Sequence, residues 1–324
     1  MPIAPDAPEI GRFAADLTRL CGEGPVLLAV SGGSDSMAML ALAMGMRAGV
    51  MVATVDHGLR ADAAVEAAMV AAICADHGLS HATLRPAGSI GGASLQARAR
   101  QARYVLLAGH ARSVGAAAIV TAHHVDDQAE TLLMRAGRGA GLSGMAGIRS
   151  RVVIEGMPVI RPLLDWRRAE LRGVVRRAGL RFVDDPANAD PRHDRTRYRR
   201  LLEENEWLDP LRLAHTASAL AEADSDVRTM TDWLWRERAT QGDTEVTLAI
   251  DDLPREWRRR LVRRAVAAVR IAAGIDAPEW PESADVESVL AMLSDGRQTT
   301  RGGVLASARG PHWRFRLAPA RRTG

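Results

Sequence analysis

The chain has 324 residues, of which 47% are hydrophobic and 25% are charged, a composition typical of a globular protein long enough for two domains. Its formal net charge is +4, and all 43 of its Lys and Arg residues are arginines. This excludes a Walker A loop and a Schiff-base mechanism, because both require a lysine. Arginine suits bidentate phosphate contacts, so the charge is compatible with an RNA partner and also with a solvated arginine-rich surface.

The sequence predicts neither a membrane span nor a secreted protein. No apolar run reaches the roughly 20 residues that cross a bilayer, and the N-terminus lacks a basic region followed by an apolar one. The two cysteines, Cys21 and Cys74, form neither a CxxC pair nor a zinc-binding spacing, and we interpret both as small buried apolar residues. We therefore expect a cytoplasmic location.

The first predicted elements are a strand and a helix joined by a polar turn. Residues 25–30 form a short apolar run typical of a buried parallel strand, and apolar residues recur at helical spacing over 34–46. Glycines in such a turn allow a ligand to approach the backbone, and free amides at a helix start attract anions. We expect nucleotide phosphates to bind here, at Ser31, Gly32, Gly33, Ser34, Asp35 and Ser36.

Asp35 is an unusual neighbour for a phosphate. It fits there if a Mg²⁺ ion lies between its carboxylate and the phosphate oxygens, since Mg²⁺ commonly takes one or two carboxylates together with substrate phosphates. The alternative interpretation is purely structural, with Ser34 capping the helix and Asp35 favouring its first turn.

Strands and helices then alternate. We expect a strand at 50–55, a helix at 62–77, a strand at 80–86, a helix at 92–113, and a strand, loop and helix over 116–141. This order predicts an α/β fold with a doubly wound, mostly parallel sheet. Ligands bind such sheets beyond the carboxyl ends of the strands, so Asp56 and His57 should join the nucleotide site.

A second polar cluster, HHVDDQAE, begins at His123. If one helix covers it, His123, Asp127 and Glu130 share a face at i, i+4 and i+7, with His124 beside them. Such a cluster suits metal binding, proton transfer or capture of a cation, whereas the spacing excludes an HExxH zinc site.

Together these blocks resemble the tRNA(Ile)-lysidine synthase family, whose first loop is similar to the PP-loop of the N-type ATP pyrophosphatases. The matching blocks cover residues 26 to about 200 and are SGGSDS, VDHGLR, ARQARY, TAHHVDDQAETLLMRAGRGAGLSGMAGI, RPLL and DDPANADPRHDRTRYR. The resemblance implies an adenine-nucleotide α-hydrolase-like fold and a ligase that uses ATP and Mg²⁺. In that family, ATP adenylates the C2 oxygen of the wobble cytidine of tRNA(Ile) with anticodon CAU, and pyrophosphate leaves. Free lysine then attacks C2 and AMP departs, which gives lysidine.

The resemblance also implies roles for single residues. Asp35 would hold the metal, Asp127 and Glu130 would receive lysine, and an acid of this cluster or His124 would remove its proton. Arg100 and Arg103 would line the active site and stabilise charge on the AMP group, although both can also be ordinary helix-surface arginines. Asn188, Arg195 and Arg199 would contact tRNA, and Asp185 and Asp190 also match the family. Ala187 and Gln96 depart from the family's serine and glutamate.

The last third of the chain resembles the family only weakly. We expect a catalytic domain over 1–205 and a smaller C-terminal α+β domain over 206–324 that binds tRNA. Within it we predict helices to about residue 238, a strand near 242–253, a basic helix over 254–273, and two short strands joined at Gly310–Pro311. Arg259 and Arg263 of the basic helix are our candidates for tRNA contacts, unless that face is merely solvated.

The sequence does not determine the oligomeric state, and a homodimer is one option. It also leaves two other functions open. One alternative is a tRNA thiolase of the same superfamily, which would use cysteines or an iron–sulfur cluster; neither cysteine follows a predicted strand. The other is a non-catalytic RNA-binding protein, which would have no use for the acids of the two clusters.

Overall fold

We describe the chain from a computed structural model, in which residues 7–46, 49–58, 62–88, 95–183, 194–281 and 283–319 are described. The chain divides into two compact units, Met1–Glu222 and Ala223–Gly324. The division falls within helix α9, Pro210–Arg238. It therefore lies downstream of the boundary after residue 205 that the sequence predicts.

The first unit is built on a six-stranded sheet with the order β3-β2-β1-β4-β6-β5. All neighbouring strands pair in parallel except β5, which pairs antiparallel with β6. The strands are β1 Val26–Ala29, β2 Val50–Val55, β3 Ser80–Leu84, β4 Ala118–Val120, β5 Arg151–Ile154 and β6 Met157–Ile160. The chain leaves β1 in one direction for β2 and β3, and β4 lies on the other side of β1. The gap between the ends of β1 and β4 is therefore the switch point at which doubly wound sheets bind ligands.

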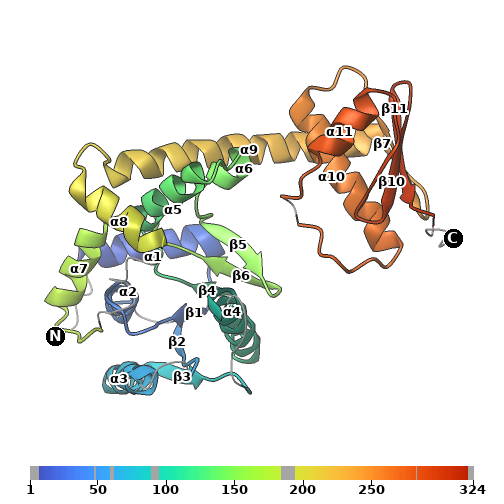
Figure 1. Ribbon diagram of the computed structural model, residues 1–324. Helices are drawn as coiled ribbons and strands as arrows, with labels where there is room; N and C mark the ends of the chain where they lie inside the picture. The colour runs from blue at the N-terminus through green and yellow to red at the C-terminus, as the bar shows by residue number, and fades with distance from the viewer. Residues whose placement is uncertain are drawn as a thin grey trace. The chain divides into compact units, whose positions relative to one another are not determined.

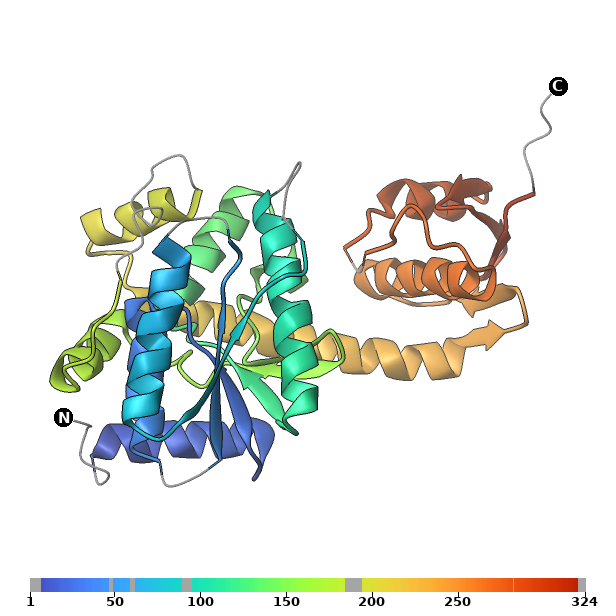
Figure 2. The same cartoon turned by 90° about the horizontal axis from the view of Figure 1, so that it is seen from below.

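Helices cover both faces of this sheet, as Figure 1 and Figure 2 show. Leu27 packs with helix α4 on one face, and the next residue, Leu28, packs with α1, α2, α3 and α7 on the other. Both faces are thus buried, which explains why the strands are continuous apolar runs. The helices are α1 Pro8–Cys21, α2 Ser34–Met44, α3 Asp62–Asp76, α4 Leu95–Ser113, α5 Val125–Gly137, α6 Leu142–Met145, α7 Arg168–Arg177 and α8 Asp194–Glu204. The predicted mostly parallel α/β fold is confirmed.

The second unit has a five-stranded antiparallel sheet with the order β7-β8-β11-β10-β9. Its strands are β7 Ala239–Gln241, β8 Glu245–Ala249, β9 Thr299–Arg301, β10 Val304–Arg309 and β11 His312–Leu317. Helices α10, Arg255–Ala272, and α11, Glu287–Ser294, pack against one face. Alternate strand residues such as Val246, Leu248, Trp313 and Phe315 fill that core. The predicted α+β character of this part is confirmed.

In the described parts of the chain, no helix combines the length and the apolar character needed to cross a membrane.

Candidate active site

The glycine turn after β1 opens directly onto the N-terminus of α2. Gly33 is the N-cap of this helix and no side chain caps it. The alternative interpretation, in which Ser34 caps the helix, is therefore excluded: Ser34 is the first helical residue. Gly32 has a φ of +89°, a backbone conformation that residues with a Cβ rarely adopt. The amides of the first turn therefore point out of the helix with its dipole behind them, as anion binding requires.

The hydroxyl groups of this turn bond to one another. Ser36 Oγ donates to the Gly33 carbonyl at 2.9 Å and accepts the Ser31 amide at 3.2 Å. Ser31 Oγ lies 3.2 Å from Ser36 Oγ, and Ser34 Oγ donates to Asp35 Oδ1 at 3.2 Å. Beyond the turn, the Val183 amide donates to the Gly32 carbonyl at 2.9 Å. The loop is held in shape from both sides before any ligand binds.

His124 joins this turn to the predicted acidic cluster. It is only 1% exposed and forms the N-cap of α5. Its Nε2 lies 3.4 Å from Asp35 Oδ2 and 3.6 Å from Asp127 Oδ2, and its Nδ1 lies 3.6 Å from Asp126 Oδ2. The ends of β1 and β4 thus bring three carboxylates around one imidazole, at the switch point of the sheet.

This arrangement fixes the protonation of the cluster. Burial alone would lower the pKa of His124, but Asp127, Asp126 and Asp35 outweigh it and raise that pKa to about 10. Burial acts to raise the pKa of Asp126, yet the pairing with His124 and the Arg168 amide brings it down to about 2. At neutral pH the cluster therefore contains an imidazolium among ionised carboxylates.

The adjacent His123 behaves differently. The prediction that it shares a helix face with Asp127 and Glu130 is wrong, because α5 begins only at Val125. His123 lies in the preceding loop, where its Nδ1 is 3.0 Å from Thr121 Oγ1. Burial lowers its pKa to about 4, against the opposing effect of Asp127, so this imidazole is neutral at physiological pH.

Asp127 and Glu130 do share a face of α5, and two arginines of α8 bind them. Arg195 donates to Glu130 Oε2 at 2.8 Å and to Asp127 Oδ1 at 2.9 Å. Arg199 donates to Glu130 Oε1 at 2.7 Å. Glu130 is only 2% exposed, so these hydrogen bonds compensate a buried charge. The acids predicted to receive a cationic substrate thus already hold an internal cation.

Asp56 and His57 follow β2 as predicted, but their surroundings differ. Asp56 accepts the Gly58 amide and Arg85 Nε, each at 2.9 Å, and these bonds lower its pKa. Its carboxylate is therefore engaged in shaping the turn. Both ring nitrogens of His57 are buried without a hydrogen-bond partner in the described structure, which leaves the ring free to meet a ligand.

A group of cations faces the site from the other side. Arg100 lies over the Tyr104 ring, 5.1 Å from its centre, and Arg103 is close enough to His57 to help burial lower the pKa of that ring. Sequence analysis missed Arg161, which follows β6 and is 4% exposed. Its Nη1 donates to the Arg149 carbonyl at 2.6 Å. None of these three arginines has a carboxylate partner within the described ranges, so together they suit an anion.

Sequence analysis also missed what holds the glycine-rich segment after α5 in place. The side chain of Gln128 donates to the Ile148 carbonyl at 2.8 Å and accepts the Ile148 amide at 2.6 Å. Arg135 donates to the carbonyls of Gly144 and Gly147 at 2.7 and 3.0 Å. A Cβ on Gly147 would lie 2.5 Å from Gln128 Oε1. The signal in the sequence is the position of Gln128, one residue beyond Asp127 and therefore turned from the acids toward this segment.

The carboxylates of the site would bind Mg²⁺ only together with the phosphates of a substrate. Among the described residues no group of three or more His, Cys, Asp or Glu side chains is arranged to hold a metal ion. Asp35 offers a carboxylate whose side chain is 30% exposed, beside the helix start that would hold phosphates. One carboxylate together with substrate phosphates is a usual set for Mg²⁺.

The predicted tRNA-binding residues have mixed surroundings. Asn188, together with Asp185, Ala187 and Asp190, lies outside the described residues. Arg195 and Arg199 bind the acids of α5, as described above. On α10, Arg259 donates to Glu287 at 2.5 Å and also binds Glu256, and Arg263 donates to the Ala284 carbonyl at 2.7 Å.

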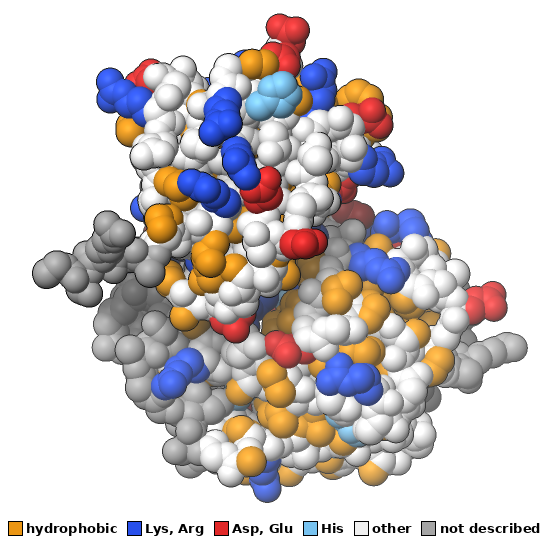
Figure 3. Space-filling model, turned by 90° about the vertical axis from the view of Figure 1, so that its right-hand side faces the viewer, with side chains coloured by type: hydrophobic (Ala, Val, Ile, Leu, Met, Phe, Trp, Pro, Cys, Tyr) orange, Lys and Arg blue, Asp and Glu red, His pale blue; other side chains and the backbone are white. Residues whose placement is uncertain are grey.

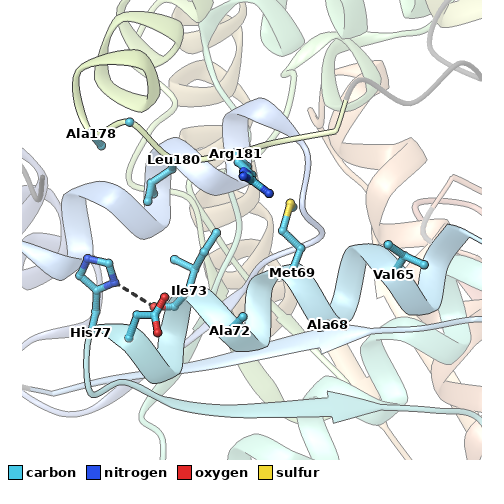
Figure 4. Close-up of a pocket in the computed structure, with 11 residues that line it drawn as sticks. Val65, Ala68, Met69, Ala72, Ile73, His77, Ala178, Leu180 and Arg181 are labelled. Atoms are coloured by element: carbon cyan, nitrogen blue, oxygen red, sulfur yellow. Dashed lines mark hydrogen bonds between the residues drawn. The ribbon is translucent and has the colours of Figure 1, made fainter.

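A separate groove of about 570 Å³ lies between α3 and residues 178–181 (Figure 4). Its lining is mainly apolar, including Val65, Met69, Ile73 and Leu180, and His77 at one end is bonded to the Ile73 carbonyl at 2.9 Å. None of the predicted site residues lines this groove, so it is not the candidate active site.

Comparisons with known proteins identify the relatives of this chain. A PP-loop domain family matches residues 8–206. The tRNA(Ile)-lysidine synthase of Novosphingobium aromaticivorans is 44% identical over 316 residues, which covers 96% of this chain and 94% of the relative. That of Zymomonas mobilis is 38% identical over 303 residues, which covers 92% of this chain and 90% of the relative.

Among solved structures, the U34-tRNA thiolase NcsA from Methanococcus maripaludis, described with its [4Fe-4S] cluster, shares the fold. The TM-score is 0.55 at 16% identity, and the match covers 66% of this chain and 79% of that chain; at this identity the likeness concerns the fold alone. The sequence relatives, with their near-complete coverage, decide the family. The chain is a member of the tRNA(Ile)-lysidine synthase family of PP-loop proteins.

Proposed function

We propose that the protein joins free L-lysine to C2 of the wobble cytidine of tRNA(Ile) with anticodon CAU, using ATP and releasing AMP and pyrophosphate. The observation that carries this proposal is the contact between Asp35 and His124, 3.4 Å apart. This contact supports the proposal because it joins the glycine turn to the acidic cluster, and an adenylation followed by amine attack needs a phosphate site next to a site for a cation. The substrates in this proposal are inferred from the names of the relatives, which are tRNA(Ile)-lysidine synthases.

In this proposal the glycine turn and the first amides of α2 bind the phosphates of ATP, with His57 beside them. Asp35 would hold a Mg²⁺ ion, which when bound neutralises phosphate charge. The guanidinium groups of Arg100, Arg103 and Arg161, which have no carboxylate partner among the described residues, stabilise the negative charge that builds up on the transferred AMP group. The first step forms the bond between the cytidine C2 oxygen and the α-phosphorus, and pyrophosphate leaves.

Lysine binds at Asp127 and Glu130, whose carboxylates attract its ε-ammonium group. The ammonium must lose a proton before it can attack, since it has no lone pair. His124 is already protonated, so we assign the proton acceptor to Asp127, and His124 keeps the carboxylates in place as their counterion. The amine nitrogen then bonds to C2, and the bond from C2 to the oxygen of AMP breaks.

The test is transfer of labelled lysine to tRNA(Ile) with anticodon CAU, in the presence of ATP and Mg²⁺. We expect lysine to enter this tRNA and pyrophosphate to be released in equal amount. The matched control is tRNA(Met), which shares the CAU anticodon, and it should receive little lysine. A protein that binds both RNAs without releasing pyrophosphate would contradict the proposal and favour a non-catalytic RNA-binding role.

The thiolase alternative finds no support in the cysteines. Both are free thiols; Cys74 is fully buried, and burial raises its pKa to about 11, so almost no reactive thiolate forms at neutral pH. Cys21 lies at the end of α1 rather than at a strand end, and burial raises its pKa as well. Replacing Cys74 by Ser should leave lysine transfer intact, whereas a sulfur-transfer enzyme would lose activity.

A further inference from the structure

Within the described residues of the second unit, helices pack on only one face of its sheet, and the other face is open. Helices α10 and α11 pack on the face formed by residues such as Leu248 and Phe315. Because strand side chains alternate between faces, the neighbours of those residues point the other way, and the strand pairing places them side by side in rows. These outward residues are Thr240, Glu245, Thr247, Ala249, Thr300, Leu305, Ser307, Arg309, His312, Arg314 and Arg316.

This open face is positively charged and rich in hydroxyl groups. It carries three arginines and a histidine against one acid, Glu245, which Arg314 binds through Nε at 3.0 Å. Arg309 and Arg316 are exposed and have no acidic partner in the described part of the chain. Figure 3 shows the side of the molecule that lies on the right in Figure 1, where several blue Lys and Arg side chains stand out among the white atoms of other side chains and the backbone.

On α10, the basic helix of the same unit, several arginines are bound to acidic residues. Arg260 donates to Asp224 at 2.7 Å and to Glu256 at 2.8 Å, and Arg264 binds Asp232. Arg259 is bound to two glutamates. Three of the arginines that made α10 a candidate for RNA are therefore bound by acids of the unit, and Arg263 donates to the Ala284 carbonyl. Arg309 and Arg316 of the sheet face, in contrast, have no acidic partner among the described residues.

We propose that the open sheet face, rather than α10, binds the phosphate backbone of the tRNA substrate; this rests on the proposed function. Guanidinium and hydroxyl groups are the usual donors to phosphate oxygens. Arg314 and Arg316 are two residues apart on one strand, about 7 Å, a spacing close to that of neighbouring phosphates. The aromatic residues of β11, Trp313 and Phe315, point into the core, so the face offers no stacking platform for bases. It therefore contacts backbone and carries no sequence preference.

The test measures tRNA(Ile) affinity as a function of salt concentration, by fluorescence anisotropy of labelled tRNA. In the double variant Arg309→Gln and Arg316→Gln, the loss of two phosphate contacts should weaken binding roughly tenfold at physiological salt and make the salt dependence shallower by about 1.5 in slope. A second double variant, Thr300→Glu with Ser307→Glu, removes no arginine and should weaken binding at least as much by repulsion.

Arg236→Gln is the matched control, since it removes an exposed arginine of α9 that is not part of the sheet, and its affinity and slope should stay within twofold of wild type. Unfolding temperatures of all variants show whether they are folded. If both double variants bind tRNA like wild type, the sheet-face proposal is overturned while lysine transfer by the wild-type protein still stands. If the wild-type protein neither binds nor modifies tRNA, the proposed function fails as well.

Discussion

At the scale of single residues, the centre of the candidate site is the ion cluster around His124. Three aspartates lie within 3.6 Å of its ring nitrogens, and two of them also bind groups from α7 or α8. The imidazolium therefore holds together carboxylates that would otherwise repel one another. Each of the following substitutions removes one charge from this cluster and has a distinct expected result.

The protonation of His124 predicts a pH dependence of stability. Its folded-state pKa of about 10 lies above the ordinary value of 6.5, so its contribution is fully present below pH 6.5 and disappears as the pH rises through 10. Wild type should therefore unfold at a higher temperature than His124→Asn at pH 7, and the difference should shrink toward pH 10.5. Thermal unfolding of metal-free protein measures this. A difference that is constant from pH 7 to 10.5 would show that His124 is not charged.

The carboxylate of Asp35 can be tested by Asp35→Asn, which keeps the size of the side chain. If Asp35 positions a metal ion at the transferred phosphate, pyrophosphate release should slow by about 10²-fold or more, as for other preorganised electrostatic groups. Asp62→Asn, in the first turn of α3, is the control and should be unaffected. Near-normal rates in Asp35→Asn would exclude the metal role.

Asp127 should act in the second step. In Asp127→Asn the lysine concentration for half-maximal transfer should rise at least tenfold, while adenylation of tRNA in the absence of lysine should persist. Rapid-quench measurement of each step separates the two. Equal loss of both steps would mean that Asp127 supports the phosphate site instead, through its contact with His124.

At the scale of elements, the site depends on hydrogen bonds that hold the glycine-rich segment after α5 against that helix. Gln128 on α5 bonds both backbone groups of Ile148, and this ties the glycine-rich segment to the helix that carries the acids. Replacing Gln128 by Leu keeps the volume but leaves two backbone groups unpaired, which should cost about 2 kcal/mol of stability. As the matched control, Gln101 donates a hydrogen bond to Glu155 Oε1 at 2.6 Å in an exposed pair, and Gln101→Leu should change stability by less than about 0.5 kcal/mol. Chemical denaturation measures the stability of both variants. Equal effects would show that the hydrogen bonds between Gln128 and Ile148 do not stabilise the fold.

The strand and helix on either side of the glycine turn could be predicted from the sequence. The β5–β6 hairpin at the edge of the sheet could not. Strand β2 was predicted at its observed bounds, and β1 and α2 within two residues, because buried parallel strands are unbroken apolar runs. The β5–β6 hairpin was missed, since β5 is a short edge strand with its Val153 68% exposed and β6 contains Pro158. Likewise, the sequence shows which residues are charged, but not that Arg195 and Arg199 pair with Asp127 and Glu130. Such pairings depend on tertiary packing of α8 on α5.

At the scale of the whole molecule, the absence of lysine determines how charge responds to pH. Every one of the 43 basic residues is an arginine, and arginine stays charged at all accessible pH values. We therefore expect the affinity for tRNA to change less than threefold between pH 7.5 and 9.5 at constant salt. Anisotropy titrations across that range test this, and a steep decline would show that a group other than arginine dominates RNA binding.

The pairing of Arg195 with both Asp127 and Glu130 has a consequence for the amino acid that enters the site. If lysine binds these two acids as we propose, its ammonium group must displace the guanidinium group of Arg195, so it gains only the difference between two cations. Under this proposal, uptake of lysine exchanges one cation for another at the two carboxylates. Its equilibrium should be weak for so charged a site, nearly insensitive to ionic strength, and open to competition from free arginine, which brings the same head group as the side chain it would replace.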